Sequence, residues 1–259
     1  MELSVKKGGT PFLQDLMEKG ALKKGDKQMG KTEYGLQMYS LRDVTDKDLR
    51  GSLEKVAQMG YRYVEFAGFF GHTATEVKSW LDAYGLVCSG THTPVNALAE
   101  EVIDETIAYH KEIGCGNLII PGMDWSSEEK MEQNITLLNT AREKLGENGI
   151  ILGYHNHSAE FFPTAYGKII EEEIISRTKV DLEVDIFWVF NAGIDPVEFC
   201  EKMKQRIRVI HLKDGIPCKT ECRNASSWDR GVRGTSVGEG QAPVKAVREW
   251  AIRNHVLMV

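Results

Sequence analysis

The sequence lacks several features that would place it in a specialised class of protein. No apolar run reaches about 18 residues, so no transmembrane helix is expected. Residues 1–7 lack the apolar core of a secretory signal, and five cysteines in 259 residues are too few for a disulfide framework. The net charge of −6 lacks the positive excess that is typical of proteins binding nucleic acids or membrane surfaces. We therefore expect a cytoplasmic globular protein without either partner; the composition says nothing about its oligomeric state.

The chain also lacks a G-x-G-x-x-G loop after its first apolar segment, which argues against a dinucleotide-binding fold. From Tyr34 onward it has instead a repeating order of short apolar segment, polar turn and helical pattern. Such alternation predicts βαβ units and a parallel sheet. We expect eight strands, at 34–39, 61–66, 86–89, 117–120, 150–154, 180–185, 208–212 and 255–259.

Helical patterns lie between these segments, and several end before a glycine or begin with a proline, as helices often do. The predicted helices are 46–59, 73–84, 96–113, 126–145, 196–206 and 243–254. Eight strands alternating with helices predict a closed (β/α)8 TIM barrel, an α/β fold, over residues 34–259. The printed sequence ends with the eighth strand, so the expected barrel lacks its last helix. Residues 1–33, rich in Lys and Gly, are interpreted as an N-terminal extension with one short helix.

Titratable side chains close several of the expected strands. In a parallel barrel the carboxyl ends of the strands form one rim, where active sites lie. Imidazoles and carboxylates together suit Zn, Mn, Co or Fe, so the pattern predicts a metal-assisted site at this rim. One histidine at a strand end would more simply be structural; here several occur together. They are Glu65, His92, His155, His157, Glu160, Glu183, Asp185, His211 and Lys213.

Five segments resemble the sugar phosphate isomerase/epimerase family, within the xylose isomerase-like TIM-barrel superfamily. They are LQMYSLRD at 36–43, GYRYVE at 60–65, YHNH at 154–157, VIHLKD at 209–214 and VGEG at 237–240. The resemblance covers about residues 34–259 in order. The superfamily also contains inosose dehydratases, ketose 3-epimerases, hydroxypyruvate isomerases and an endonuclease IV branch. The negative net charge and the number of ligands argue against the endonuclease branch.

The resemblance implies one divalent metal ion, Mn, Co, Mg or Zn. It implies that His155, Asp185 and His211 bind this ion at the ends of strands five, six and seven. His155 stands where the family usually has a glutamate. The family's fourth ligand is a glutamate after strand eight, and the printed sequence stops at Val259, where that segment is expected to begin.

The chemistry implied is isomerisation or epimerisation of a ketose, keto-sugar or sugar phosphate through an enediolate. A dehydratase or lyase acting on a keto-inositol or keto-sugar, similar to inosose dehydratase, uses the same first step and stays an alternative. A non-catalytic sugar-binding barrel is the third reading. We expect His157, Glu160 or Glu183 to move the proton and Lys213 to stabilise the anion. Substrate contacts are expected at Glu65, His92 and Trp188, since an aromatic ring stacks on the apolar face of a sugar.

Two further features lie after strand seven. Residues 214–242 form the longest irregular stretch, and a loop of this length in a compact domain is usually functional or mobile. Within it, the C-x-x-x-C at 218–222 is interpreted as two free thiols, because no second cysteine pair lies nearby to complete a zinc site.

Overall fold

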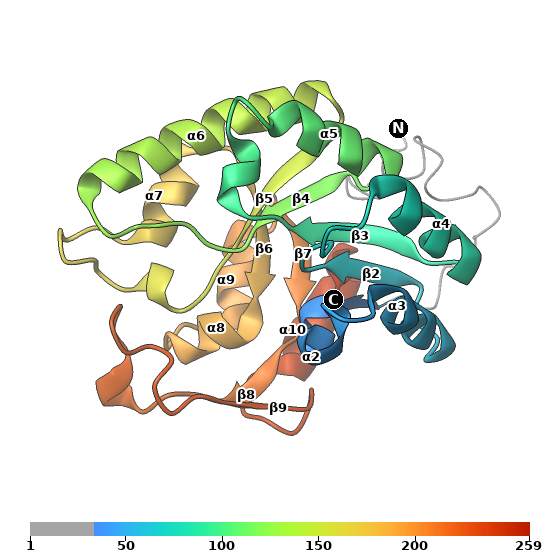
Figure 1. Ribbon diagram of the computed structural model, residues 1–259. Helices are drawn as coiled ribbons and strands as arrows, with labels where there is room; N and C mark the ends of the chain where they lie inside the picture. The colour runs from blue at the N-terminus through green and yellow to red at the C-terminus, as the bar shows by residue number, and fades with distance from the viewer. Residues whose placement is uncertain (1–33) are drawn as a thin grey trace, which may run out of the picture.

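The computed structural model describes residues 34–259; the N-terminal extension predicted over 1–33, with its short helix, lies outside the described residues. Eight strands form one parallel sheet in sequence order, and a parallel bridge between Tyr34 and Met258 joins its two edges into a nearly closed barrel (Figure 1). The predicted TIM-like barrel is thus confirmed. The strands are β1 Gly35–Gln37, β2 Tyr63–Phe66, β3 Val87–His92, β4 Asn117–Ile120, β5 Ile151–His155, β6 Asp181–Asp185, β7 Ile207–His211 and β10 Leu257–Met258.

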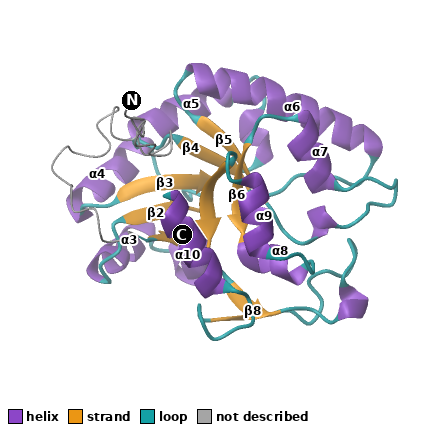
Figure 2. Cartoon of the chain, turned by 180° about the vertical axis from the view of Figure 1, so that it is seen from behind, coloured by secondary structure: helices purple, strands orange, loops and turns teal. Residues whose placement is uncertain are grey.

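Helices surround the strands on the outside of the barrel (Figure 2). Among the described residues, no helix is long and apolar enough to cross a membrane, and none follows β10. The helices are α2 Arg42–Thr45, α3 Leu49–Gln58, α4 Ala74–Tyr84, α5 Ile103–Glu112, α6 Glu128–Glu147, α7 Ile170–Arg177, α8 Ile186–Asn191, α9 Pro196–Met203 and α10 Val244–Asn254.

Local sequence explains where several helices begin and end. Thr73 caps α4 in a capping box with Glu76, and Gly85 ends it in the left-handed conformation with φ of 67°. The predicted helix 96–113 is wrong in its first part, because the chain forms a 3-10 turn at Val95–Leu98 and leaves the helical conformation at Ala99 before α5 begins. Helices α7 and α8 were not predicted. The α8 sequence, IFWVFN, is apolar almost throughout and shows no helical period.

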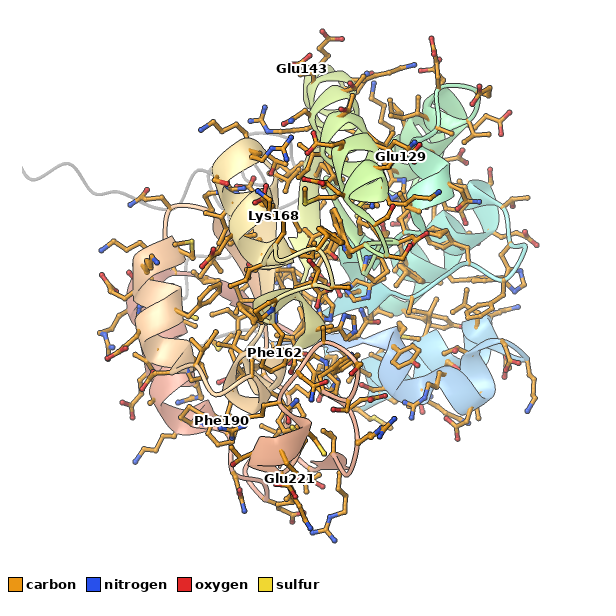
Figure 3. The ribbon with its side chains drawn as sticks, turned by 90° about the vertical axis from the view of Figure 1, so that its left-hand side faces the viewer. Glu129, Glu143, Phe162, Lys168, Phe190 and Glu221 are labelled. Atoms are coloured by element: carbon orange, nitrogen blue, oxygen red, sulfur yellow. The ribbon has the colours of Figure 1, made fainter. Side chains whose placement is uncertain are left out.

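The core lies between the strands and the helices that cover them. In α6, Met131, Ile135, Leu138 and Leu145 are buried on one face, at the spacing expected for an amphipathic helix. The opposite face carries exposed charge, and Figure 3 shows the Glu129 and Glu143 side chains extending outward from α6.

The stretch after β7 is more regular than the sequence predicted. It contains an antiparallel hairpin of β8 Asp214–Ile216 and β9 Arg233–Thr235. The buried Asp214 carboxylate accepts hydrogen bonds from the backbone N–H groups of Gly215, Gly238, Gly240 and Ala242, at 2.8, 2.9, 2.9 and 3.0 Å. Burial acts to raise the pKa of Asp214, but these donors outweigh it and hold the pKa below its usual value. Asp214 therefore joins the start of β8 to the segment that follows β9.

Candidate metal centre

Four side chains bring potential metal ligands together at the carboxyl ends of the strands. His92 ends β3, His155 ends β5, Glu183 lies within β6 and His211 ends β7. The sheet register places His155 directly beside Glu183. One ligand atom from each of the four residues lies within 4.8 Å of the others. We call these four residues the metal cluster.

One carboxylate oxygen lies at the centre of the metal cluster. Glu183 Oε2 is 2.6 Å from His92 Nε2, 3.1 Å from His155 Nδ1 and 3.2 Å from His211 Nε2. A second carboxylate, Glu65 of β2, lies against the same group. Its Oε1 atom is 2.9 Å from His211 Nε2 and 3.2 Å from His92 Nε2.

Both carboxylates are buried, with 0% exposure for Glu65 and 1% for Glu183. Among the described residues, Glu65 Oε2 and Glu183 Oε1 have no hydrogen-bond partner. Buried polar atoms without partners are costly, and these two oxygens are available to a cation. Three imidazoles and a carboxylate are donors that suit a borderline divalent ion. The metal cluster could therefore hold a metal ion.

The charges in this region are strongly coupled. Burial raises the pKa of Glu65 to about 7, and the neighbouring Glu183 carboxylate adds to the rise. Burial acts to raise the Glu183 pKa as well, but His211 and His92 outweigh it and hold the pKa well below its usual value. Burial acts to lower the pKa of His211, and the two glutamates reverse this and raise it well above the ordinary value. The two glutamates therefore favour positive charge at the position of His211.

His155 behaves differently from His211. Burial holds the pKa of His155 well below its usual value, so its imidazole is neutral. A neutral imidazole is the form that binds metal.

Asp185, the third ligand suggested by the resemblance, lies at the edge of the metal cluster. Its Oδ1 accepts hydrogen bonds from the backbone N–H groups of Phe187 at 3.0 Å and Trp188 at 3.2 Å, and so caps α8. Its Oδ2 lies 4.0 Å from His155 Nε2 and 3.7 Å from Lys213 Nζ. Burial raises the pKa of Asp185.

His157 and Glu160, two residues predicted to move a proton, lie side by side beyond β5. The His157 ring centroid is 4.9 Å from that of His155. Glu160 is buried; its Oε2 accepts a hydrogen bond from the His157 backbone N–H, and its Oε1 accepts one from the Tyr154 hydroxyl, both at 3.1 Å. Burial lowers the pKa of His157 to about 4, with Lys213 contributing, and raises that of Glu160.

The predicted substrate contacts divide into two groups. Glu65 and His92 lie in or against the metal cluster. Trp188 lies farther out, where its ring centroid is 5.8 Å from that of His157 and the Lys213 ammonium is 4.2 Å from its ring centroid.

The sequence analysis missed two residues near the metal cluster, Gln37 and Trp228. Gln37 Nε2 donates a hydrogen bond to Glu65 Oε1 at 2.5 Å, and Gln37 Oε1 accepts one from the Tyr39 backbone N–H at 2.9 Å. The signal was a polar side chain at the carboxyl end of strand one. Trp228, in the segment between β8 and β9, has its ring centroid 5.6 Å from that of His157. Only its place in a long loop pointed to it.

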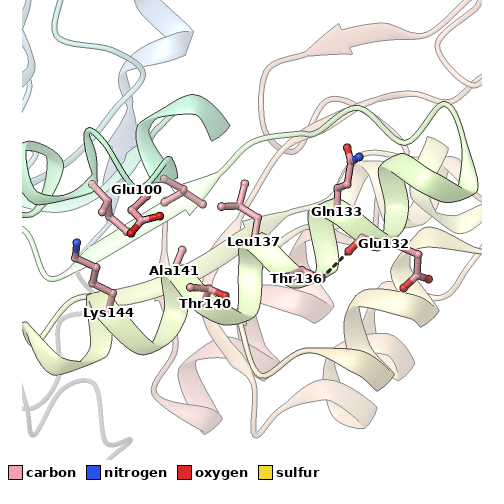
Figure 4. A pocket seen from close by; sticks show the side chains of 10 residues that line it. Glu100, Glu132, Gln133, Thr136, Leu137, Thr140, Ala141 and Lys144 are labelled. Atoms are coloured by element: carbon pink, nitrogen blue, oxygen red, sulfur yellow. Dashed lines mark hydrogen bonds between the residues drawn. The ribbon is translucent and has the colours of Figure 1, made fainter.

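A separate groove of 680 Å³ lies on the outside of the barrel (Figure 4). Its lining comes largely from α6, including Leu137, Thr140, Ala141 and Lys144. None of the metal-cluster residues lines it, and its walls combine apolar and polar side chains with a few separate charged ones. Its chemistry therefore gives no reason to place the functional site there.

The family of xylose isomerase-like TIM barrels matches residues 53–253 of the chain. Because this match covers most of the chain, the protein belongs to that family, and the resemblance stated from the sequence is confirmed.

Individual relatives agree with this assignment. The chain is 25% identical over 186 residues to an inosose dehydratase of Geobacillus kaustophilus; the alignment covers 62% of this chain and 60% of that protein. A sugar phosphate isomerase/epimerase structure from Parabacteroides distasonis matches with a TM-score of 0.71 and 25% identity, over 88% of this chain and 89% of that one. An L-ribulose 3-epimerase matches with a TM-score of 0.60 and 11% identity, over 88% and 80%, which shows the shared fold alone.

Proposed function

We propose that this member of the xylose isomerase-like TIM-barrel family is a metal-dependent isomerase or epimerase. Its substrate would be a ketose, keto-sugar or sugar phosphate, converted through an enediolate. The observation that carries the proposal is the metal cluster, with its central Glu183 carboxylate and the unpartnered oxygens of Glu183 and Glu65. It occupies the rim at which TIM-barrel enzymes carry out their chemistry.

The ligands in this proposal are His92, His155, Glu183 and His211. A divalent ion bound there would supply Lewis acidity, which polarises a carbonyl and stabilises negative charge on the adjoining oxygens. Asp185 is a further ligand suggested by the resemblance, and its substitution tests that role. Glu65 balances the positive charge of the site and orients His211 through their 2.9 Å contact.

His157 is the first candidate for proton transfer. Its ring lies beside His155, and burial lowers its pKa to about 4, so the imidazole is neutral but only weakly basic at neutral pH. Glu160 holds His157 in place by accepting a hydrogen bond from the His157 backbone N–H. A base works best when its pKa is near the operating pH, so Glu65, with a pKa of about 7, is the second candidate. Lys213 would stabilise the anion.

A dehydratase of a keto-inositol or keto-sugar is the second candidate function. The similarity to the Geobacillus inosose dehydratase favours it. The first step would again remove a proton next to a carbonyl. The second would break the bond to a β-hydroxyl, and an acid would donate a proton to the departing oxygen so that water leaves.

The experiment that tests both functions follows the substrate's α-hydrogen. Protein loaded with Mn²⁺ would be incubated in deuterated water with ketoses, keto-inositols and their phosphates, and exchange would be followed by NMR. Exchange without loss of water supports an isomerase or epimerase; exchange with loss of water supports the dehydratase. If metal-loaded protein shows neither, both proposals fail and the non-catalytic sugar-binding reading gains.

The variant His211→Ala supplies the site control, and His72→Ala is its matched partner, since His72 packs on Trp80 of α4 rather than in the metal cluster. We expect His211→Ala to lose both bound Mn²⁺ and exchange, and His72→Ala to keep them. Equal metal content in wild type and His211→Ala would show that the site does not exist as described.

A further inference from the structure

An aromatic surface borders the metal cluster on the side of β6 and β7. We define this aromatic wall by His157, Trp188 and Trp228. The ring centroids of Trp188 and Trp228 are 4.9 Å apart with an interplanar angle of 82°, and His157 lies 5.8 Å from the first and 5.6 Å from the second. His157 in turn lies against His155 of the metal cluster. A molecule bound at the metal cluster would therefore meet this wall.

The two tryptophans of the wall are not equally open. Trp188 is only 9% exposed, and the Lys213 ammonium lies 4.2 Å from its ring centroid. The same ammonium is 3.7 Å from Asp185 Oδ2, which holds it in place. Trp228 is half-buried and lies in the segment between β8 and β9, which runs beside α8 (Figure 1). Trp228 is thus the more exposed of the two rings, and the Trp188 contact predicted from the sequence stays a prediction.

A buried network holds Trp228 in this position. Asn191, the last residue of α8, donates a hydrogen bond from Nδ2 to the Trp228 carbonyl at 2.8 Å, and its Oδ1 accepts one from the Cys218 backbone N–H at 2.7 Å. Asn191 Nδ2 also donates to Ser158 Oγ at 2.9 Å, and Asn191 and Ser158 are both fully buried. These bonds hold the long loop in place while the Trp228 indole stays partly exposed. The loop therefore positions that ring.

Charge at the wall selects against a phosphate. The Lys213 ammonium is already paired with the Asp185 carboxylate and covers the Trp188 ring. A dianion placed at the wall would have to share the Lys213 ammonium with the Asp185 carboxylate, which lies 3.7 Å from it, and would lose water to do so. The C–H face of a neutral sugar ring, by contrast, packs well on an aromatic ring, and its hydroxyls keep their contact with water.

We propose that Trp228 is the specificity-determining residue of the site and that the substrate presents a neutral, unphosphorylated carbohydrate ring to it. This inference rests on the proposed function, since it takes the metal cluster as the site of reaction. It assigns Trp228 a binding role and no part in proton transfer.

The test measures binding through tryptophan fluorescence on Mn²⁺-loaded protein. The probes are D-fructose, a keto-inositol and methyl β-D-glucopyranoside, each compared with D-fructose 6-phosphate. We expect a neutral probe to quench the fluorescence with saturation and to bind more tightly than the phosphate. Trp228→Ala should weaken this binding about tenfold, and Trp228→Phe by no more than about threefold because a flat ring remains. Trp80→Phe, on α4, should leave the affinity unchanged.

Turnover separates a binding role from a structural one. For the converted substrate, Trp228→Ala should raise KM about tenfold and leave kcat within about twofold, with unchanged metal content. The inference is overturned if no neutral probe binds, if the phosphate binds most tightly, or if Trp228→Ala binds as wild type does. Trp228-dependent binding without solvent exchange would overturn the proposed function alone. Exchange whose KM is the same in wild type and Trp228→Ala would overturn this inference alone.

Discussion

The metal cluster and the turn at Asp214 hold buried carboxylates in opposite ways. Both oxygens of Asp214 are satisfied by backbone N–H groups, and its pKa is lowered. In the metal cluster region, Glu65 and Glu183 each keep one buried oxygen without a partner among the described residues. This difference in hydrogen bonding distinguishes Asp214, which holds the fold together, from Glu65 and Glu183, which are arranged for a ligand.

The largest effect should come from Glu183→Gln. The change removes the negative charge at the centre of the metal cluster while it keeps the side chain's shape. We expect Mn²⁺ affinity to fall by at least about 100-fold, because a charged ligand and the charge that balances His211 are both lost. Isothermal titration would measure it. Glu143→Gln, on the exposed face of α6, is the matched control and should bind as wild type does.

Asp214→Asn should lower the stability of the fold and leave metal binding unchanged. Each Asp214 oxygen accepts two of the four backbone N–H groups, and an amide nitrogen cannot accept, so two of these donors lose their partner. We expect the free energy of unfolding to fall by about 2 kcal/mol, as for other charge-assisted hydrogen bonds lost from a buried site. Urea denaturation would measure it. Metal bound per folded molecule should stay the same; a loss of metal as large as that of Glu183→Gln would erase the distinction between the two regions.

The pH dependence of metal binding should sharpen the comparison. His211 must lose its proton to bind an ion, and Glu183 and Glu65 raise its pKa well above the ordinary value. Apparent Mn²⁺ affinity should therefore rise with pH above the normal histidine range, by up to about tenfold per unit, until His211 is neutral. Competition titrations between pH 6 and 9 would show it. Glu65→Gln should move this rise to lower pH; an unchanged midpoint would contradict the assigned coupling.

The smallest effect concerns Glu171, a buried carboxyl in α7 that lies outside the metal cluster. Burial raises its pKa to about 8, and Glu160 adds to the rise. A carboxyl whose pKa is raised on folding contributes stability below its unfolded pKa, and that contribution is lost as the pH rises through about 8. The wild type should therefore lose a few degrees of Tm between pH 6 and 9. Glu171→Gln should lose less over that range; an equal loss would place the titrating group elsewhere.

The positions of the cluster residues could be predicted because each of them lies at or near the end of a parallel strand. Glu65, His92, His155, Glu183 and His211 were all placed at one rim on that ground. Strand geometry alone does not distinguish Glu183 from Asp185, because residues two apart on a strand point the same way; the resemblance assigned Asp185 to the metal ion. In the structure α8 begins directly after β6, and its first N–H groups donate hydrogen bonds to the Asp185 carboxylate. Asp185 as a metal ligand stays a prediction.

Other features depended on contacts that sequence patterns do not record. Helix α8 lacks a periodic pattern because nearly all of its residues are buried. Trp228 is joined to α8 by Asn191, 37 positions earlier, which donates a hydrogen bond to the Trp228 carbonyl. The hairpin of β8 and β9 was likewise read as irregular, because three-residue strands are too short to show alternation.

The hydrogen bonds between Asn191 and the segment joining β8 to β9 have a consequence for how this protein can change over evolutionary time. Asn191 binds the loop through the Cys218 backbone N–H and the Trp228 backbone carbonyl, and these groups are present whatever side chains stand there. Substitutions between the two anchor points therefore leave these two hydrogen bonds in place. Selection, or a directed library at residues 219–228, could alter ligand preference without rebuilding the barrel. The side chains of this loop could then be exchanged while the barrel that carries it stays the same.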